Sequence, residues 1–314
     1  MPDPVTHYVF GQQVIAQLPG DIRKAMEMPV YQRAIQGPDP WSTLGFYGGK
    51  AKRYARRGVA MHRCKTGLFL LELTRRAKQE QALFSVLAGT ICHYCLDRHA
   101  HPYIICRGGT RDGGHTRLER AIDSYYIRST YGKKPWHFSL PRQIMSCRQY
   151  PKTLRHGLNA AYKTVYGWED AFPLINQSLR DERWFYGLMQ DPFGLVHMLL
   201  RLVSGGKTNY SMYSFFHRDI HRGKLDYLNE ERKPWQHPFD PSIVSTASFF
   251  DLFDRAKQEA VEMIRVAYDW IFQGGESMPL FENSNYSTGF DCDDPRNLRQ
   301  PQCQPLAYSG KYWN

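Results

Sequence analysis

The chain has 314 residues, of which 42% are apolar and 14% aromatic, a composition typical of a globular protein with a sizeable core. Its 41 basic and 30 acidic residues give a formal net charge of +11, which favours an anionic partner such as a phosphate ester, a nucleic acid or a lipid head group. The seven cysteines are irregularly spaced, which argues against a disulfide framework.

The apolar runs of the chain are short. None approaches the roughly 18–20 residues that cross a bilayer, and the first residues, 1–7, lack a basic leader followed by an apolar stretch. The sequence therefore predicts no transmembrane segment and the cytoplasm as the location.

Helical periodicity recurs along the chain and strand signals are scarce, so the expected fold class is all-α. Proline and glycine positions are expected to end or interrupt the helices. We expect helices over residues 9–18, 22–35, 50–78, 80–99, 115–127 and 245–272, with shorter pieces within 138–165 and 168–203. Residues 1–314 should form one domain, with loop-rich stretches of open role at 205–244 and 274–314.

Two pairs of potential metal ligands stand four residues apart in the centre of this pattern. They are His93 with Asp97 and His115 with Glu119, and His101 continues the first series at the same spacing. Positions i and i+4 share one face of a helix, so each pair can direct an imidazole and a carboxylate at the same ion. A buried imidazole–carboxylate hydrogen bond is the alternative reading of each pair taken alone.

Further candidate ligands precede these pairs. His7 lies near the N-terminus, His62 lies in the expected helical segment 50–78, and Asp39 lies between two prolines. A stiff loop can hold a carboxylate in fixed geometry for metal binding or for accepting a proton. From spacing alone, the better interpretation of Asp39 is a turn-forming residue of a loop rich in proline and glycine.

The ordered series of these eight side chains resembles the ligand set of the zinc-dependent phospholipase C family and of the related single-strand-specific nucleases. The resemblance covers roughly the first 125 residues and implies a multi-helix bundle with a trinuclear zinc site between its helices. It implies up to three Zn²⁺ ions, held by Asp39, His62, His93 and Asp97; by His101, His115 and Glu119; and by His7 with Asp97, which bridges to the first ion.

Two positions depart from the pattern of that family. The spacing from Asp97 to His101 is short, so His99 is a rival ligand, although His101 keeps the helical face better. The third ion needs a further ligand, and we hypothesise that the amine and carbonyl of Pro2 supply it after removal of Met1.

The resemblance implies a phosphoric ester hydrolase that uses a metal-activated water, with Asp39 as the residue that orients the water or accepts its proton. Trp41, Phe46 and Tyr47 directly follow Asp39 and are candidate substrate contacts, for a choline-like cation or a base, or else core residues. The expected substrate is a phosphate ester, such as a phospholipid, and a nucleic acid is the alternative. A zinc-binding scaffold without turnover, which binds lipid or a protein partner, is the alternative from a different class.

Overall fold

The computed structural model describes residues 4–111, 113–203, 205, 225–276 and 278–306. The described part is mostly helical and contains a single two-stranded sheet, which confirms the all-α fold class. None of the described helices combines the length and the apolarity needed to cross a lipid bilayer.

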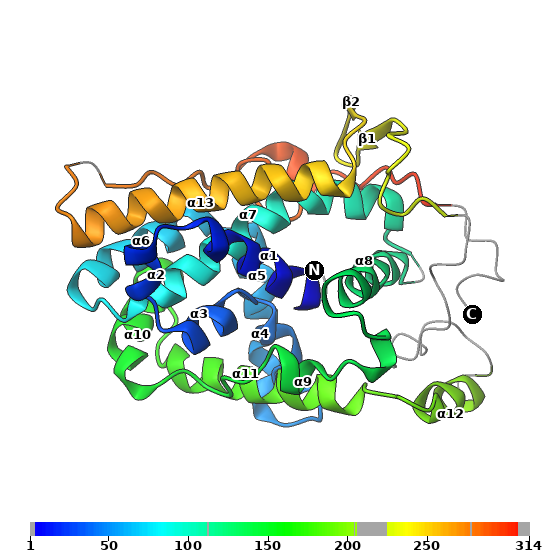
Figure 1. Cartoon of the computed structure of the whole chain (residues 1–314), viewed down its shortest axis with the longest axis horizontal. Helices are drawn as coiled ribbons and strands as arrows, with labels where there is room; N and C mark the ends of the chain where they lie inside the picture. The colour runs from blue at the N-terminus through cyan, green and yellow to red at the C-terminus, as the bar shows by residue number, and fades with distance from the viewer. Residues whose placement is uncertain (1–3, 112, 204, 206–224, 277, 307–314) are drawn as a thin grey trace.

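The long helix α7 (Leu83–Gly108) is the centre of the molecule (Figure 1). All but three of its 26 residues are buried, and it packs against α1, α3, α6, α8, α13 and β1. The helices before it are α1 (Pro4–Gln17), α2 (Gly20–Lys24), α3 (Met28–Ala34), α4 (Pro40–Thr43), the 3-10 turn η1 (Lys50–Tyr54), α5 (Arg56–Arg63) and α6 (Thr66–Gln79).

The expectation that this helix ends before Pro102 is wrong, because α7 continues for six residues beyond the proline. A proline inside a helix removes one backbone hydrogen bond and costs about 3 kcal/mol. Pro102 itself is buried, and so are Tyr103 and Ile104 after it, so the packing of this last part of the helix offsets the cost.

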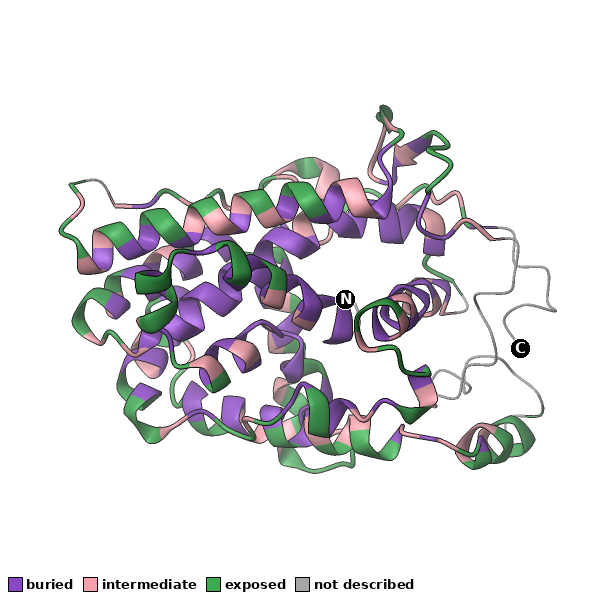
Figure 2. Cartoon of the chain, in the orientation of Figure 1, coloured by how far each residue is buried: buried purple, intermediate pink, exposed green. Residues whose placement is uncertain are grey.

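The elements after α7 complete the bundle around it. These are α8 (Gly114–Tyr131), η2 (Pro135–His137), α9 (Leu140–Gln143), η3 (Lys152–Leu154), α10 (Arg155–Tyr166), α11 (Ala171–Leu188), α12 (Leu195–Val203), α13 (Phe249–Phe272) and η6 (Pro295–Leu298). Helix α13 lies along α7 over most of its length (Figure 1). Apolar residues on one side of α13, such as Phe253, Ala260 and Ile264, are buried (Figure 2).

The stretch expected to be loop-rich contains a short antiparallel hairpin. Strands β1 (Trp235–His237) and β2 (Asp240–Ser245) pair with an irregularity between Gln236 and His237. Neither strand shows sustained apolar alternation, so periodicity gives no strand signal there. Residues 206–224 of the same stretch lie outside the described residues.

Candidate metal centre

The eight predicted ligands come from five separate parts of the fold and meet beside α7. His7 lies on α1, Asp39 precedes α4, and His62 lies on α5. Helix α7 supplies His93, Asp97 and His101, and α8 supplies His115 and Glu119. Their donor atoms form three groups, His7–His93–Asp97, Asp39–His62–His93 and His101–His115–Glu119, within each of which the atoms lie within 4.8 Å of one another.

Asp97 joins the groups through its two carboxylate oxygens. Its Oδ1 lies 3.2 Å from His7 Nε2, whereas its Oδ2 lies 3.1 Å from His93 Nε2 and 3.6 Å from His62 Nε2. The carboxylate therefore faces two sets of imidazoles at once, an arrangement in which it can bridge two cations. Its side chain is fully buried.

The second carboxylate near His93 belongs to Asp39. Its Oδ1 lies 3.0 Å from His62 Nε2 and 3.6 Å from His93 Nε2. The third group is arranged around Glu119, whose Oε1 lies 2.8 Å from His115 Nε2 and 3.7 Å from His101 Nε2. Both carboxylates thus face the Nε2 atoms of two imidazoles.

Backbone carbonyls orient three of the imidazoles. His62 Nδ1 lies 2.7 Å from the Gly58 carbonyl, and His93 Nδ1 lies 3.2 Å from that of Ile35. His101 Nδ1 lies 3.1 Å from the carbonyl of Tyr286. A ring that donates from Nδ1 presents its lone pair at Nε2. The Nε2 atoms of His62 and His93 face Asp39 and Asp97, and that of His101 faces Glu119, although His101 Nδ1 also lies 3.5 Å from Asp97 Oδ2.

The innermost donors are buried and lie at ion-pair distances from one another, but they make no well-directed hydrogen bond within the described part of the chain. This holds for both ring nitrogens of His7, for His93 Nε2 and for both oxygens of Asp97. Unsatisfied buried polar atoms are rare in proteins because their desolvation is costly. A converging set of imidazole nitrogens and carboxylate oxygens is suited to a divalent cation such as zinc, so these residues fit the expected metal.

The electrostatics of Asp97, His7 and His115 agree with this interpretation, whereas Asp97 and Asp39 raise the pKa of His93 against the effect of its burial. Burial would raise the pKa of Asp97, but the imidazoles of His101 and His93 hold it well below its usual range. Burial lowers the pKa of His7 and of His115, which favours the neutral, metal-binding form of both rings.

His99, the rival of His101, points elsewhere. Its Nε2 lies 2.7 Å from Glu259 Oε2 on α13, and Arg98 also pairs with Glu259. Burial and the neighbouring Arg98 lower the pKa of His99 to about 4. His101, one turn further along the same face as Asp97, is therefore the histidine that joins Glu119. The proposed ligand Pro2 lies outside the described residues.

The three aromatic residues after Asp39 have different surroundings. Trp41 is buried, and Arg57 lies over its ring and over those of Tyr54 and Trp168. The place at this ring where a choline-like cation would bind is thus filled by a guanidinium of the protein. The structure places Trp41 in the core.

Phe46 and Tyr47 lie nearer the surface. Phe46 is partly buried against Phe185, whereas Tyr47 is 67% exposed. The Tyr47 hydroxyl donates to Asp181 Oδ1 at 3.1 Å, and the same carboxylate accepts the Gly45 N–H through Oδ2. Asp181 on α11 therefore fixes the loop that carries both rings, and Tyr47 is the one of the three that is open to a substrate.

The C-terminal segment 282–292 is a part of the site that the motif pattern does not reveal. It lies against α6 and α7, since Thr66 donates to the Ser284 carbonyl and Tyr94 to the Glu282 carbonyl, both at 2.7 Å. The Tyr286 ring packs on His62 and His93, and the backbone N–H of Tyr286 donates to the His62 carbonyl. Segment 282–292 therefore fixes the positions of His62 and His101 through the backbone of Tyr286.

Asp123 performs a similar role for His7. Its carboxylate accepts the N–H groups of Val5 and Thr6, at 3.0 and 2.7 Å, and so anchors the first turn of α1. Asp123 continues the His115–Glu119 series at four-residue spacing, so periodicity alone could have identified it. The carbonyl acceptors and Tyr286 carry no comparable sequence signal.

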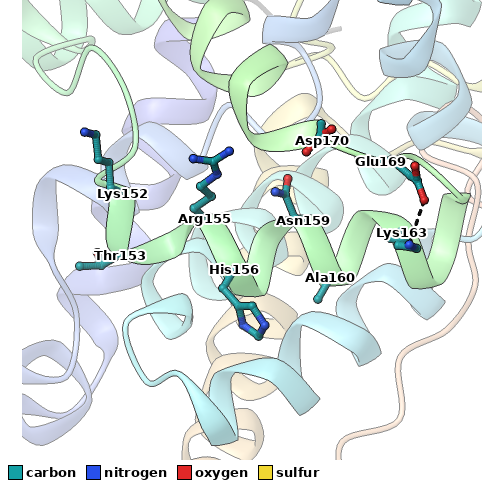
Figure 3. Close-up of a pocket in the computed structure, with 9 residues that line it drawn as sticks. All are labelled: Lys152, Thr153, Arg155, His156, Asn159, Ala160, Lys163, Glu169 and Asp170. Carbon is teal, nitrogen blue, oxygen red and sulfur yellow. Dashed lines mark ion pairs between the residues drawn. The ribbon is translucent and has the colours of Figure 1, made fainter.

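A second hollow on the surface is unrelated to this centre (Figure 3). It lies on η3, α10 and the end of the loop before α11, and Lys163 pairs with Glu169 at its rim at 2.9 Å. None of its residues belongs to the three ligand groups. Cys92 and Cys95 form a C-x-x-C sequence on α7, but their thiols are directed to other partners than the metal centre. Cys92 contacts the Tyr31 hydroxyl, and Cys95 contacts Met263.

Comparison with known protein families, with characterised proteins and with solved structures gives no match to this chain. Within the described part of the chain, the buried His, Asp and Glu groups can hold metal ions.

Proposed function

We propose that the protein is a zinc-dependent phosphoric ester hydrolase with a phospholipase C-like bundle. The observation that carries the proposal is the set of three ligand groups linked by His93 and Asp97 at the side of α7. Five imidazoles and three carboxylates without a thiolate are typical of reactive zinc sites, whereas structural zinc sites are usually closed and rich in cysteine.

Bound zinc ions would neutralise the phosphate, activate water and stabilise the leaving oxygen. The protein contributes the geometry. Its buried carboxylates face the imidazoles of the centre. The backbone carbonyls of Gly58, Ile35 and Tyr286 keep three of these imidazoles in one orientation. Asp39, the one ligand carried by the proline-flanked turn, would accept the proton of the attacking water.

Among the eight ligands, His115 is the most exposed to solvent, and Asp39 and His62 follow at 9% and 7%. The side chain of His115 is 25% exposed, whereas those of His7, His93 and Asp97 are fully buried. We therefore assign substrate entry to the His115 side, where the phosphate would meet the third ligand group first.

The proposal is tested by zinc analysis and by hydrolysis of an aryl phosphodiester. We expect up to three zinc ions per chain and chelator-sensitive turnover. Asp39→Asn should lower kcat by at least about 100-fold, in line with the contribution of a positioned acid or base, and retain part of the zinc. A chain that binds no zinc would contradict the hydrolase proposal. An Asp39→Asn variant with full activity would contradict the role of Asp39 as proton acceptor.

A nuclease is the second candidate, because the net charge of +11 favours a polyanionic substrate. Arg111 and Arg117 flank the start of α8 close to His115 in sequence. Parallel assays on phosphatidylcholine and on single-stranded DNA distinguish the two substrates. Zinc binding without hydrolysis of any of the three substrates would instead favour the non-catalytic scaffold.

A further inference from the structure

Helix α12 exposes its apolar residues to solvent, whereas an ordinary surface helix buries them. Seven of its nine residues are apolar, in the sequence LVHMLLRLV, and none is buried. The apolar stripe Leu195, Leu199 and Leu202 is 59–71% exposed, and Figure 2 shows no buried residue along the helix. Helices of globular proteins turn such a stripe towards a core.

The exposed apolar surface of the described chain is concentrated here. Eight of the sixteen large apolar side chains that are strongly exposed lie between Trp184 and Val203. They include the aromatic residues Trp184 and Phe193, exposed by 67% and 80%. Burying one such side chain is worth about 1.5–3 kcal/mol, so the stripe is a strong driving force for association.

The polar residues of this stretch indicate the kind of partner. His197 and Arg201, four residues apart, form the polar side of α12, and the helix contains no acidic residue. The one acidic residue between Trp184 and Val203, Asp191, is buried and accepts the His197 N–H. A surface with aromatic and leucine side chains, a basic residue and no exposed acid is complementary to an anionic lipid bilayer, as is the net charge of +11.

The dimensions of the helix exclude a transmembrane role. Nine residues span about 14 Å, roughly half of the hydrocarbon core of a bilayer. We propose that α12 is an interfacial anchor that lies in the head-group region of a phospholipid bilayer, with Leu195, Leu199 and Leu202 inserted. This binding goes beyond the proposed hydrolysis and needs no turnover.

The test is sedimentation of the full chain with vesicles of phosphatidylcholine, with and without 30% phosphatidylserine (roughly the anionic range to which basic helices respond). We expect binding to both, stronger to the anionic vesicles and weaker in high salt. The double variant Leu199→Glu with Leu202→Glu should lower the bound fraction at least about tenfold, since it places two charges in the inserted stripe.

A matched control carries the same two changes elsewhere. Leu280→Glu with Leu298→Glu alters side chains that are 94% and 89% exposed outside α12 and changes the net charge equally. This variant should bind vesicles nearly as the native chain does. Equal loss in both double variants would overturn the proposal, because it would reduce the effect to net charge.

Two further measurements keep the outcome clear. Hydrolysis of a soluble aryl phosphodiester and the zinc content should be the same in both double variants, so that a failure of the hydrolase proposal is seen separately. Leu202→Gln is the milder second variant and should weaken vesicle binding by a smaller factor. A native chain that binds neither kind of vesicle, or a dimer that the α12 variant dissociates in light scattering, would overturn the proposal.

Discussion

The histidines of the centre owe their orientation to close backbone contacts as well as to hydrogen bonds. Gly37 has a φ of +50°, and a Cβ at this position would lie 2.4 Å from Cγ of His93. The glycine therefore permits both the left-handed turn before Asp39 and the approach of the His93 ring.

We predict that Gly37→Ala lowers zinc affinity by about 10–100-fold, the range seen when the surroundings of a metal ligand are disturbed. The added methyl group must displace the His93 ring, which belongs to two ligand groups. Competition with a fluorescent chelator measures the effect. Gly167→Ala is the control, because its φ is +69° and no atom lies within 4 Å of the added Cβ.

Both variants carry the backbone cost of a left-handed alanine, about 1 kcal/mol. Only Gly37→Ala should change zinc binding. Native zinc affinity in Gly37→Ala would show that His93 is placed independently of this turn.

His237 gives the fold a pH dependence outside the centre. Its Nε2 donates to the Thr288 carbonyl at 2.9 Å, and its Nδ1 accepts the Phe239 N–H at 3.2 Å. Burial lowers the pKa of His237. The ring is therefore held neutral, because a proton on Nδ1 would break the bond from Phe239.

The unfolded chain binds a proton at His237 near pH 6.5, whereas the folded chain does so only at lower pH. The free energy of unfolding contributed by this ring is thus present above about pH 6.5 and lost as the pH falls below it. We predict that His237→Gln makes stability less dependent on pH between 7.5 and 5.5 in chemical denaturation. A His237→Gln variant whose free energy of unfolding keeps the native slope with pH would contradict this role of the ring.

The candidate ligands could be predicted from the sequence, because His7, Asp39, His62 and the pairs at four-residue spacing are recognised by side-chain type and position. The partners that orient them could not. Gly58, Ile35 and Tyr286 act through backbone carbonyls, which every residue possesses, so only the packing of the elements reveals them.

At the scale of elements, the start of α13 shows how local chemistry sets a boundary. Ser248 and Asp251 form a capping box, in which each side chain bonds the backbone N–H of the other. Periodicity predicts a helix from about residue 245, whereas the residues before the box belong to β2. The interior of the helix was predictable and its first turn was not.

We predict that Ser248→Ala lowers the free energy of unfolding by about 1 kcal/mol, because it removes the hydroxyl that accepts the Asp251 N–H. Urea denaturation measures the change. Ser146→Ala, at an exposed position outside any helix, should leave stability within about 0.5 kcal/mol of the native value. An equal effect of the two substitutions would argue against the capping role.

Segment 282–292 was expected only as part of a loop-rich tail, yet it closes over the ligands. We predict that Tyr286→Ala weakens zinc binding, because it removes the ring that packs on His62 and His93. Tyr162→Ala is the matched control, a buried tyrosine packed on Trp41 and Trp168.

Each tyrosine variant should lose about 3–5 kcal/mol of stability through the cavity that it creates. Zinc affinity separates them. At a temperature where both are folded, Tyr286→Ala should release zinc to a chelator faster than Tyr162→Ala. Equal release would mean that segment 282–292 supports the fold without positioning the ligands.

For the whole molecule, the convergence of α1, α5, α7 and α8 is the feature that no local pattern determines. His7 and Asp97 are 90 positions apart, and their contact depends on how α1 crosses α7. Periodicity gives the buried face of each helix, but how the helices lie against one another depends on tight contacts such as that of Gly11 on α1 with Ile35 at the end of α3. The resemblance to a known ligand set predicted the grouping that periodicity alone left open.

Because these buried groups converge from distant elements, metal binding and folding should be coupled throughout the chain. An ion that binds only the folded state stabilises it by about 4 kcal/mol when its free concentration is 1,000 times its Kd. With an unfolding entropy of about 2.1 cal/mol/K per residue, 1 kcal/mol shifts the Tm of a chain of 314 residues by about 1.5 °C. Removal of one such ion should therefore lower Tm by about 6 °C, and removal of several ions by more.

Zinc added back should restore the native Tm, whereas magnesium, which prefers oxygen ligands, should not. Asp97→Asn tests the origin of the effect, because Asp97 faces the His7 side and the His62–His93 side at once. This variant should have a low Tm that chelation changes much less. If removal of zinc left the Tm of the native chain unchanged, side-chain packing without metal would be sufficient to hold these helices together.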